Sequence, residues 1–176
     1  MKIALVIGHN NRSEGAYSET LGMTEYDYYK EVAAKVKEEL KDVVDIYERQ
    51  PNKSYTREMT PVIEKINSNK YDYILELHFN AATNKETQGC ECLVHFKSTQ
   101  GINIANNFLN KITNKFRNLR NRGLIKIENS SQRGGYGICK TKYPYILVEP
   151  FFGSNEFANQ FTTDIMANLL VDFIRG

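Results

Sequence analysis

The chain has 176 residues, 41% of them hydrophobic and 25% charged, and this balance predicts a globular domain with a substantial core and excludes a disordered chain. Its 23 basic and 21 acidic residues give a net charge of +2, which provides no argument for nucleic-acid binding. No apolar run approaches the roughly 18 residues of a membrane span, so we expect no stable membrane insertion.

Short apolar runs rich in β-branched and aromatic residues alternate along the chain with segments of helical period. The N-terminal run IALVIG (3–8) is too short for the apolar core of a signal peptide, and it predicts a first strand. Further strands are expected at 43–48, 71–79, 90–96 and 145–152, and helices at 29–40, 57–68, 104–119 and 161–173. This alternation predicts an α/β fold: a single three-layer domain over residues 1–176, with a mostly parallel twisted sheet of about six strands and helices on both faces.

Three of these strands carry a chemically active side chain to their carboxyl ends. KIALVIGHN closes on His9, ILELHFNAA delivers His78, and YPYILVEPFF delivers Glu149. Ligands of open α/β sheets bind at the carboxyl ends of the strands, so the three side chains could converge in one crevice. Each histidine alone could be an ordinary core or surface residue, but together they favour a metal site, because neutral imidazole is a common zinc ligand.

A third ligand is expected to be a carboxylate, and four glutamates compete for that role. Glu14 and Glu19 lie in a polar loop, which would hold a ligand poorly. Glu76 precedes the second histidine by two residues and is better suited to orient a ligand than to bind the metal. Glu25 opens a helix that Thr24 can cap, so it would be held on a rigid element, and we favour it.

Glu149 has two interpretations. A carboxylate at the end of an apolar strand is costly to bury without a partner, so it could be half of a structural salt bridge. Beside a zinc site it could instead take a proton from the attacking water and later deliver it to a leaving group.

Other candidate features carry less weight. Cys90, Cys92 and His95 cannot form one site on a strand, because the histidine points to the opposite face. The three cysteines, with Cys139, are an odd and sparse set, so we expect no disulfide framework and folding in a reducing cytoplasm. The segment Lys111–Lys142 has nine basic residues and one acid, which predicts either a solvated surface or attraction to an anionic polymer.

The motifs VIGHN, TEYDYYKEVAAKV, ELHFNAA, LRNRGL and LVEPFFGSN, in this order, resemble those of the zinc-dependent N-acetylmuramoyl-L-alanine amidases of bacterial autolysins and phage endolysins. The resemblance covers nearly the whole chain. It implies one zinc ion per chain held by His9, Glu25 and His78, with Glu149 as the catalytic glutamate and Asn80 as a substrate-binding, site-shaping residue. It also places a loop at 119–124, before the last strands.

The resemblance implies a peptidoglycan hydrolase that cleaves the amide between N-acetylmuramic acid and L-alanine. Without a signal peptide, such an enzyme would be a phage endolysin that reaches the wall through a separate membrane lesion, and we expect a monomer without a separate wall-binding domain. Another zinc hydrolase (a peptidase or deacetylase) and a non-catalytic wall-binding module are the alternatives. Asn10, Asn11 and Tyr29 depart from the residues that the family often has at these positions.

Overall fold

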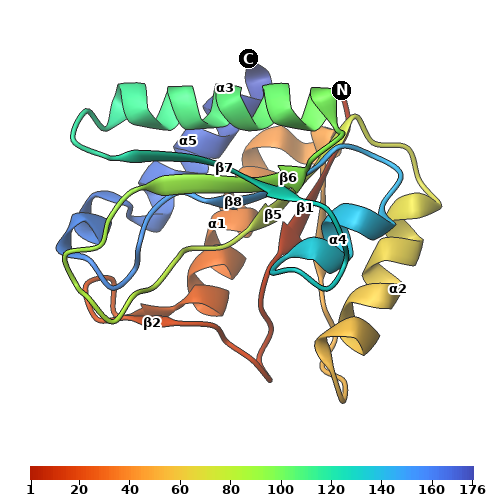
Figure 1. Ribbon diagram of the computed structural model, residues 1–176, viewed down its shortest axis with the longest axis horizontal. Coiled ribbons are helices and arrows are strands. Elements are labelled where there is room, and N and C mark those ends of the chain that lie inside the picture. Colours follow the sequence, from red (N-terminus) through yellow and green to blue (C-terminus); the bar gives the residue numbers. More distant parts are fainter.

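The apolar runs form a six-stranded sheet, and the amphipathic segments between them form helices that pack on it (Figure 1). The computed structural model describes residues 1–176. The strands are β1 (Ile3–Ile7), β2 (Tyr17–Ser18), β3 (Met23–Thr24), β4 (Val44–Glu48), β5 (Tyr73–Leu77), β6 (Cys90–His95), β7 (Asn121–Ile127) and β8 (Tyr145–Glu149). The α-helices are α1 (Glu25–Leu40), α2 (Tyr55–Asn67), α3 (Thr99–Lys115), α4 (Gly135–Lys140) and α5 (Thr163–Arg175), with 3-10 turns η1 (Lys41–Val43) and η2 (Glu156–Gln160).

The large sheet has the strand order β4-β1-β5-β8-β6-β7, and β2 pairs with β3 in a separate ribbon. All neighbours in the large sheet are parallel except β6 and β8, which are antiparallel. Ile7 of β1 lies beside Leu77 of β5, and Leu77 lies beside Val148 of β8. These three strands therefore end at the same edge of the sheet, as the sequence predicted for a mostly parallel sheet.

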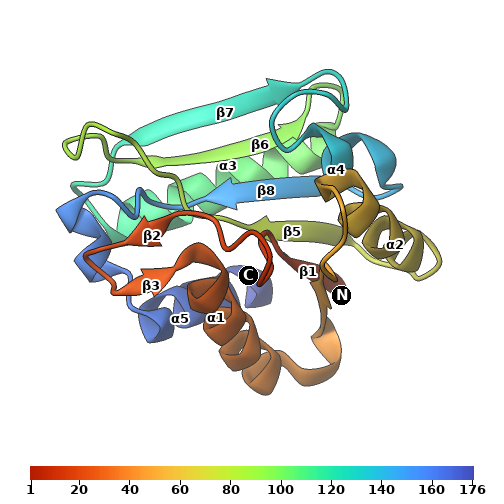
Figure 2. The same cartoon turned by 90° about the horizontal axis from the view of Figure 1, so that it is seen from below.

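Alternate residues of each strand face two separate cores. One core lies under α1, α3 and α5 and takes the odd-numbered residues of β1 and β5. The other lies under α2 and α4 and takes residues such as Ala4, Ile74 and Leu147. Figure 2 shows the sheet between these groups of helices. The three-layer α/β architecture predicted from the sequence is confirmed, and none of its helices is both long and apolar enough to cross a lipid bilayer.

Two elements differ from the sequence predictions. The segment expected to be a loop, at 119–124, enters the edge strand β7, whose outer residues include Arg122 and Lys126. Charged side chains are common on edge strands, so they weakened the apolar signal of this strand. Helix α4 is not among the helices expected from the sequence, because its six residues are too few to show a helical period.

Candidate metal centre and catalytic carboxylate

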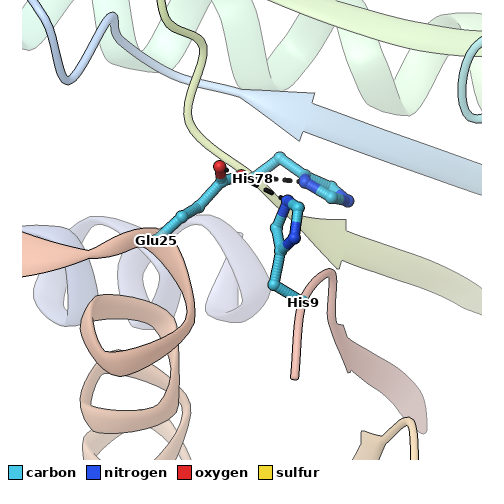
Figure 3. A group of neighbouring side chains, drawn as sticks. All are labelled: His9, Glu25 and His78. Atoms are coloured by element: carbon cyan, nitrogen blue, oxygen red, sulfur yellow. Dashed lines mark hydrogen bonds and ion pairs between the residues drawn. The ribbon is translucent and has the colours of Figure 1, made fainter. Parts of the chain in front are cut away.

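His9, Glu25 and His78 lie together although they come from three different elements (Figure 3). His9 follows β1, Glu25 is the first residue of α1, and His78 follows β5. One donor atom from each side chain lies within 4.8 Å of the other two. The Glu25 carboxylate is central, with Oε1 2.8 Å from His78 Nδ1 and Oε2 3.4 Å from His9 Nε2. The structure thus brings together the three residues predicted as metal ligands.

The local sequence fixes Glu25 on a rigid helix end. The Thr24 hydroxyl caps α1 by accepting a hydrogen bond from the Asp27 backbone N–H at 3.1 Å, and it donates to the Asp27 carboxylate at 2.8 Å. Glu25 itself is buried, and its carboxylate accepts hydrogen bonds from the backbone N–H groups of Phe79 (2.9 Å) and Ala16 (3.4 Å). These contacts orient both carboxylate oxygens toward the histidines, which is the orientation that a metal ligand needs.

The His9 ring is oriented by its neighbours in the turn after β1. Its Nδ1 lies 2.9 Å from the Ser13 carbonyl oxygen, which can only accept, so Nδ1 donates to it and Nε2 is the ring nitrogen that faces Glu25. Behind this turn the buried Arg49 donates to the Gly8 carbonyl and accepts, through its own carbonyl, a bond from the Asn10 side chain. Asn10, a departure from the family pattern, is fully buried and stabilises this turn.

His78 lies between two carboxylates. Its Nδ1 faces Glu25, and its Nε2 lies 3.2 Å from Oε1 of Glu76, whose other oxygen accepts a bond from the Tyr145 hydroxyl at 2.8 Å. A carboxylate on the far nitrogen orients the imidazole and makes it a better metal donor. The Tyr29 hydroxyl, a second departure from the family pattern, donates to the His78 carbonyl at 2.7 Å and so holds the end of β5.

Two glycines provide the space for these side chains. A Cβ atom on Gly8 would lie 2.1 Å from Nε2 of His78, so the ring can occupy its place only above a glycine. Gly15 has a positive φ of 78°, and a Cβ there would lie 2.7 Å from Oε2 of Glu25. The ligand cluster is therefore packed directly against backbone that bears no side chain.

The charges of the cluster support a cation site. Burial raises the pKa of Glu25, but its bonds to His78 and His9 outweigh this and lower the pKa to about 2. Burial lowers the pKa of His78, but the adjoining Glu25 and Glu76 carboxylates outweigh it and raise the pKa to about 10. Two imidazoles and one carboxylate are a known zinc ligand set, so these residues fit the ion that the sequence predicts.

Glu149 lies at the end of β8 and is only 7% exposed. Directly opposite on the antiparallel β6 is a second buried carboxylate, Glu91, at 5% exposed. The Asn80 side-chain amide donates to both, at 2.9 Å to each, and Arg133 Nη2 lies 2.9 Å from Glu91 and 3.1 Å from Glu149. Glu149 therefore has a salt-bridge partner, Arg133, which was one of the two interpretations of the sequence. It also has a carboxylate neighbour, Glu91, which the sequence did not predict.

Burial and the hydrogen bond with Glu91 raise the pKa of Glu149 to about 7. Glu91 has the opposite shift: burial raises its pKa, but its bonds to Glu149, Arg122 and Arg133 outweigh this and lower it. A carboxyl group with a pKa near neutrality can both accept and release a proton at physiological pH. Both N–H groups of Asn80 face the carboxylates, so its contact with a substrate stays a prediction.

The metal cluster and Glu149 line the same cavity, of about 280 Å³. A neighbouring hollow of about 470 Å³ shares Tyr55, Arg133 and Gly134 with it. The two hollows therefore lie side by side and share part of their wall. Together they can hold a group larger than a single small ligand.

The remaining sequence candidates lie outside this cavity. Cys90 and Cys92 are buried in the core under α3, and burial raises the pKa of both thiols, so neither is a reactive thiolate. His95 follows them on the opposite face. The basic residues of the segment Lys111–Lys142 have two different environments. Arg122 on β7 and Arg133 contact Glu91, whereas others are solvated.

A mostly parallel sheet carries His9, His78 and Glu149 at its strand ends, and a helix brings Glu25 to the histidines, which is a layout suited to hydrolysis beside a candidate metal site. The chain matches the sequence model of the N-acetylmuramoyl-L-alanine amidase family over residues 3–166 and belongs to this family.

Solved structures of the same family share the fold. The chain is 27% identical to the catalytic domain of an endolysin targeting Clostridium difficile, with a TM-score of 0.77 and 99% and 97% of the two chains covered. It is 19% identical to an N-acetylmuramoyl-L-alanine amidase from Clostridium difficile 630 (TM-score 0.77, 99% and 94% covered) and 20% identical to an amidase of Nostoc punctiforme (TM-score 0.77, 99% and 95% covered). A sequence comparison with curated proteins gave no match.

Proposed function

We propose that the protein is a zinc-dependent hydrolase of peptidoglycan that cleaves the amide between N-acetylmuramic acid and L-alanine. The observation that carries this proposal is the shared cavity, in which the His9, Glu25 and His78 donors converge beside a buried Glu149. Family membership supplies the bond, because the matched family is that of N-acetylmuramoyl-L-alanine amidases.

Four residues of the cavity have a direct role in this reaction. His9, Glu25 and His78 would hold one zinc ion, which when bound would polarise the scissile carbonyl and lower the pKa of the attacking water. Glu149 accepts a proton from that water while the water oxygen forms a bond with the carbonyl carbon. Glu149 then gives the proton to the alanine nitrogen as the carbon–nitrogen bond breaks. The products are a lactyl carboxylic acid and a free amine, and Glu149 is again a carboxylate.

The two neighbouring hollows suit a polymeric substrate. The cavity at the histidines is small, but the hollow lined by Tyr55, Thr56 and Ser131 lies next to it. Hydroxyl groups and aromatic rings along this hollow suit a chain of amides or sugars, which needs hydrogen-bond partners over its length.

Product analysis separates this proposal from its rivals. Digestion of purified cell walls should expose new L-alanine amino groups and no new reducing sugar ends. Release of acetate would indicate a deacetylase, and new amino groups on residues other than the first alanine would indicate a peptidase. A wall-binding module would release nothing.

Two measurements test the roles of zinc and Glu149. Purified protein should contain about one zinc ion per chain, and chelation should abolish activity. Glu149→Gln should keep its zinc, because Glu149 is not assigned as a ligand, and should lose about 10²–10⁴-fold in rate. Full activity after exhaustive chelation would exclude the zinc mechanism, and loss of zinc from Glu149→Gln would make Glu149 a ligand.

We further propose that the protein acts as an endolysin, in which case it would lyse the wall from within the cell. The endolysin catalytic domain at 27% identity supports this role. Expressed inside bacteria, the protein should cause lysis only when a separate agent permeabilises the membrane, and Glu149→Gln should not. Lysis without any membrane lesion would argue for an exported autolysin instead.

A further inference from the structure

No sequence motif pairs Glu149 with another acid, but in the structure a second carboxylate, that of Glu91, lies opposite it. Strands β6 and β8 lie side by side (Figure 2). Glu149 and Glu91 are direct partners in their antiparallel pairing, and both side chains are buried. We propose that Glu91 is a positioning residue for Glu149, and that the two carboxylates share one proton while Arg133 contacts both of them. This inference rests on the proposed role of Glu149 as the group that moves the proton.

The geometry gives the pair one common environment. The Asn80 amide nitrogen lies 2.9 Å from Oε1 of Glu91 and 2.9 Å from Oε2 of Glu149, so both oxygens gather around one donor. Two buried carboxylates this close do not both ionise freely, and their protons are lost in two coupled steps. The first proton to bind enters a hydrogen bond between the two groups, and Glu149 holds it because Glu91 has the greater number of cationic partners.

The negative charge of Glu91 raises the pKa of Glu149, whereas the positive charge of Arg133 lowers it. Arg133 lies on the loop between β7 and α4, and its Nη2 contacts Glu91 at 2.9 Å and Glu149 at 3.1 Å. The next residue, Gly134, has a φ of 68°, and a Cβ there would lie 2.7 Å from Leu147 of β8, so only glycine lets the loop come this close to the sheet. Arg122 contacts Glu91 alone, at 2.8 Å, and anchors it from β7.

The other ionisable groups around Glu149 come from three elements. His78 lies beyond the end of β5, Cys92 is on β6, and Tyr29 is on α1. All three are left unchanged in the variants below, so a shift in the titration of Glu149 reports on Glu91 or Arg133.

The pair makes Glu149 fit for both halves of the reaction. The negative charge of Glu91 makes Glu149 a stronger base when it takes the proton from water. The same hydrogen bond holds the protonated Glu149 in one orientation until the leaving nitrogen accepts the proton. Glu91 ends the cycle in the same protonation state in which it began.

The proposal predicts opposite shifts for two variants. Protein labelled with ¹³C at the glutamate side-chain carboxyl groups would be titrated by NMR, and the Glu149 signal assigned by its loss in Glu149→Gln. Glu91→Gln should move the midpoint of Glu149 downward by about one pH unit or more, because it removes a close like charge. Arg133→Gln should move it upward, by about half a unit to one unit, since Arg133 is half exposed and its charge is partly screened.

The pH dependence of cleavage gives a second readout. The acid limb of kcat/KM should follow the NMR midpoint, downward in Glu91→Gln and upward in Arg133→Gln, with zinc content unchanged in both. Arg133→Gln should therefore regain activity at alkaline pH. Glu128→Gln, which changes an exposed acid next to the same loop, is the matched control and should move neither.

A merely structural role for Glu91 predicts no shift, or shifts in the same direction for both variants, and either result would overturn the proposal. If Glu91→Gln does not fold, Arg122→Gln weakens the anchor of Glu91 without touching Glu149, and it should still move the midpoint. The NMR titration does not depend on activity. A wild-type protein that fails to cleave the wall amide would thus refute the proposed function, whereas the NMR shifts would still decide whether the pair shares a proton.

Discussion

Zinc binding to this protein should release a proton from His78, and the zinc affinity should rise tenfold with each pH unit. In the metal-free cluster both ring nitrogens face carboxylates, and the pKa of His78 is raised to about 10. A zinc ligand must offer the lone pair of Nδ1, so the proton there has to leave. At pH 7, about three units below this pKa, removing the proton costs about 4 kcal/mol. Between pH 7 and pH 8.5 the affinity should therefore increase about 30-fold.

Competition with a chelator of known affinity at both pH values measures this increase, and the proton released in weakly buffered solution gives an independent count. Glu76→Gln is the informative variant, because it removes one of the two carboxylates that stabilise the charged ring. It should flatten the pH dependence while zinc still binds. A wild-type affinity that stays constant from pH 7 to pH 8.5, with no proton released, would refute the reasoning.

Three further predictions concern the ligands, the packing and the surface. Glu25→Ala should weaken zinc binding far more than Glu76→Gln, because it removes a ligand and not a supporting carboxylate, and the reverse order of dissociation constants would exchange their roles. Gly8→Ala should lose zinc and thermal stability, since its Cβ would overlap the His78 ring, and an unchanged melting temperature with full zinc content would contradict this packing. Wall binding through the solvated part of the Lys111–Lys142 segment should fall steeply with salt in a pelleting assay, and binding that is insensitive to salt would leave that segment without a role in attraction.

The part of the site that local signals encode could be predicted from the sequence. His9 and His78 follow apolar runs that are typical of buried parallel strands, and parallel strands end at a common edge. Glu25 was preferred to other glutamates because Thr24 caps the helix that it opens, and the structure has that cap. The three-layer fold followed from the same alternation of strands and helices, without reference to any contact between distant residues.

Glu91 and Arg133 could not be predicted in this way. The strand of Glu91 runs against its neighbour, so the residue reaches the catalytic edge from the beginning of β6 and not from its end. The available sequence signal is a lone acid in an apolar run, CECLVH, which does not indicate its partner on a distant strand. Arg133 belongs to a charged segment whose members are solvated at some positions and paired with carboxylates at others, and charge patterns alone do not distinguish these.

The strand order separates two kinds of chemistry along the chain. The metal cluster is built from β1, α1 and β5, within the first 78 residues, and the paired carboxylates are carried by β6 and β8, in the rest of the chain. The two groups come together where β5 pairs with β8. The side chain of Asn80, two residues after His78, donates there to Glu149 at the end of β8. The shared cavity therefore exists only once β8 has paired with β5, late in the synthesis of the chain. A ribosome-bound fragment that ends before β8 would carry His9, Glu25 and His78 but not Glu149.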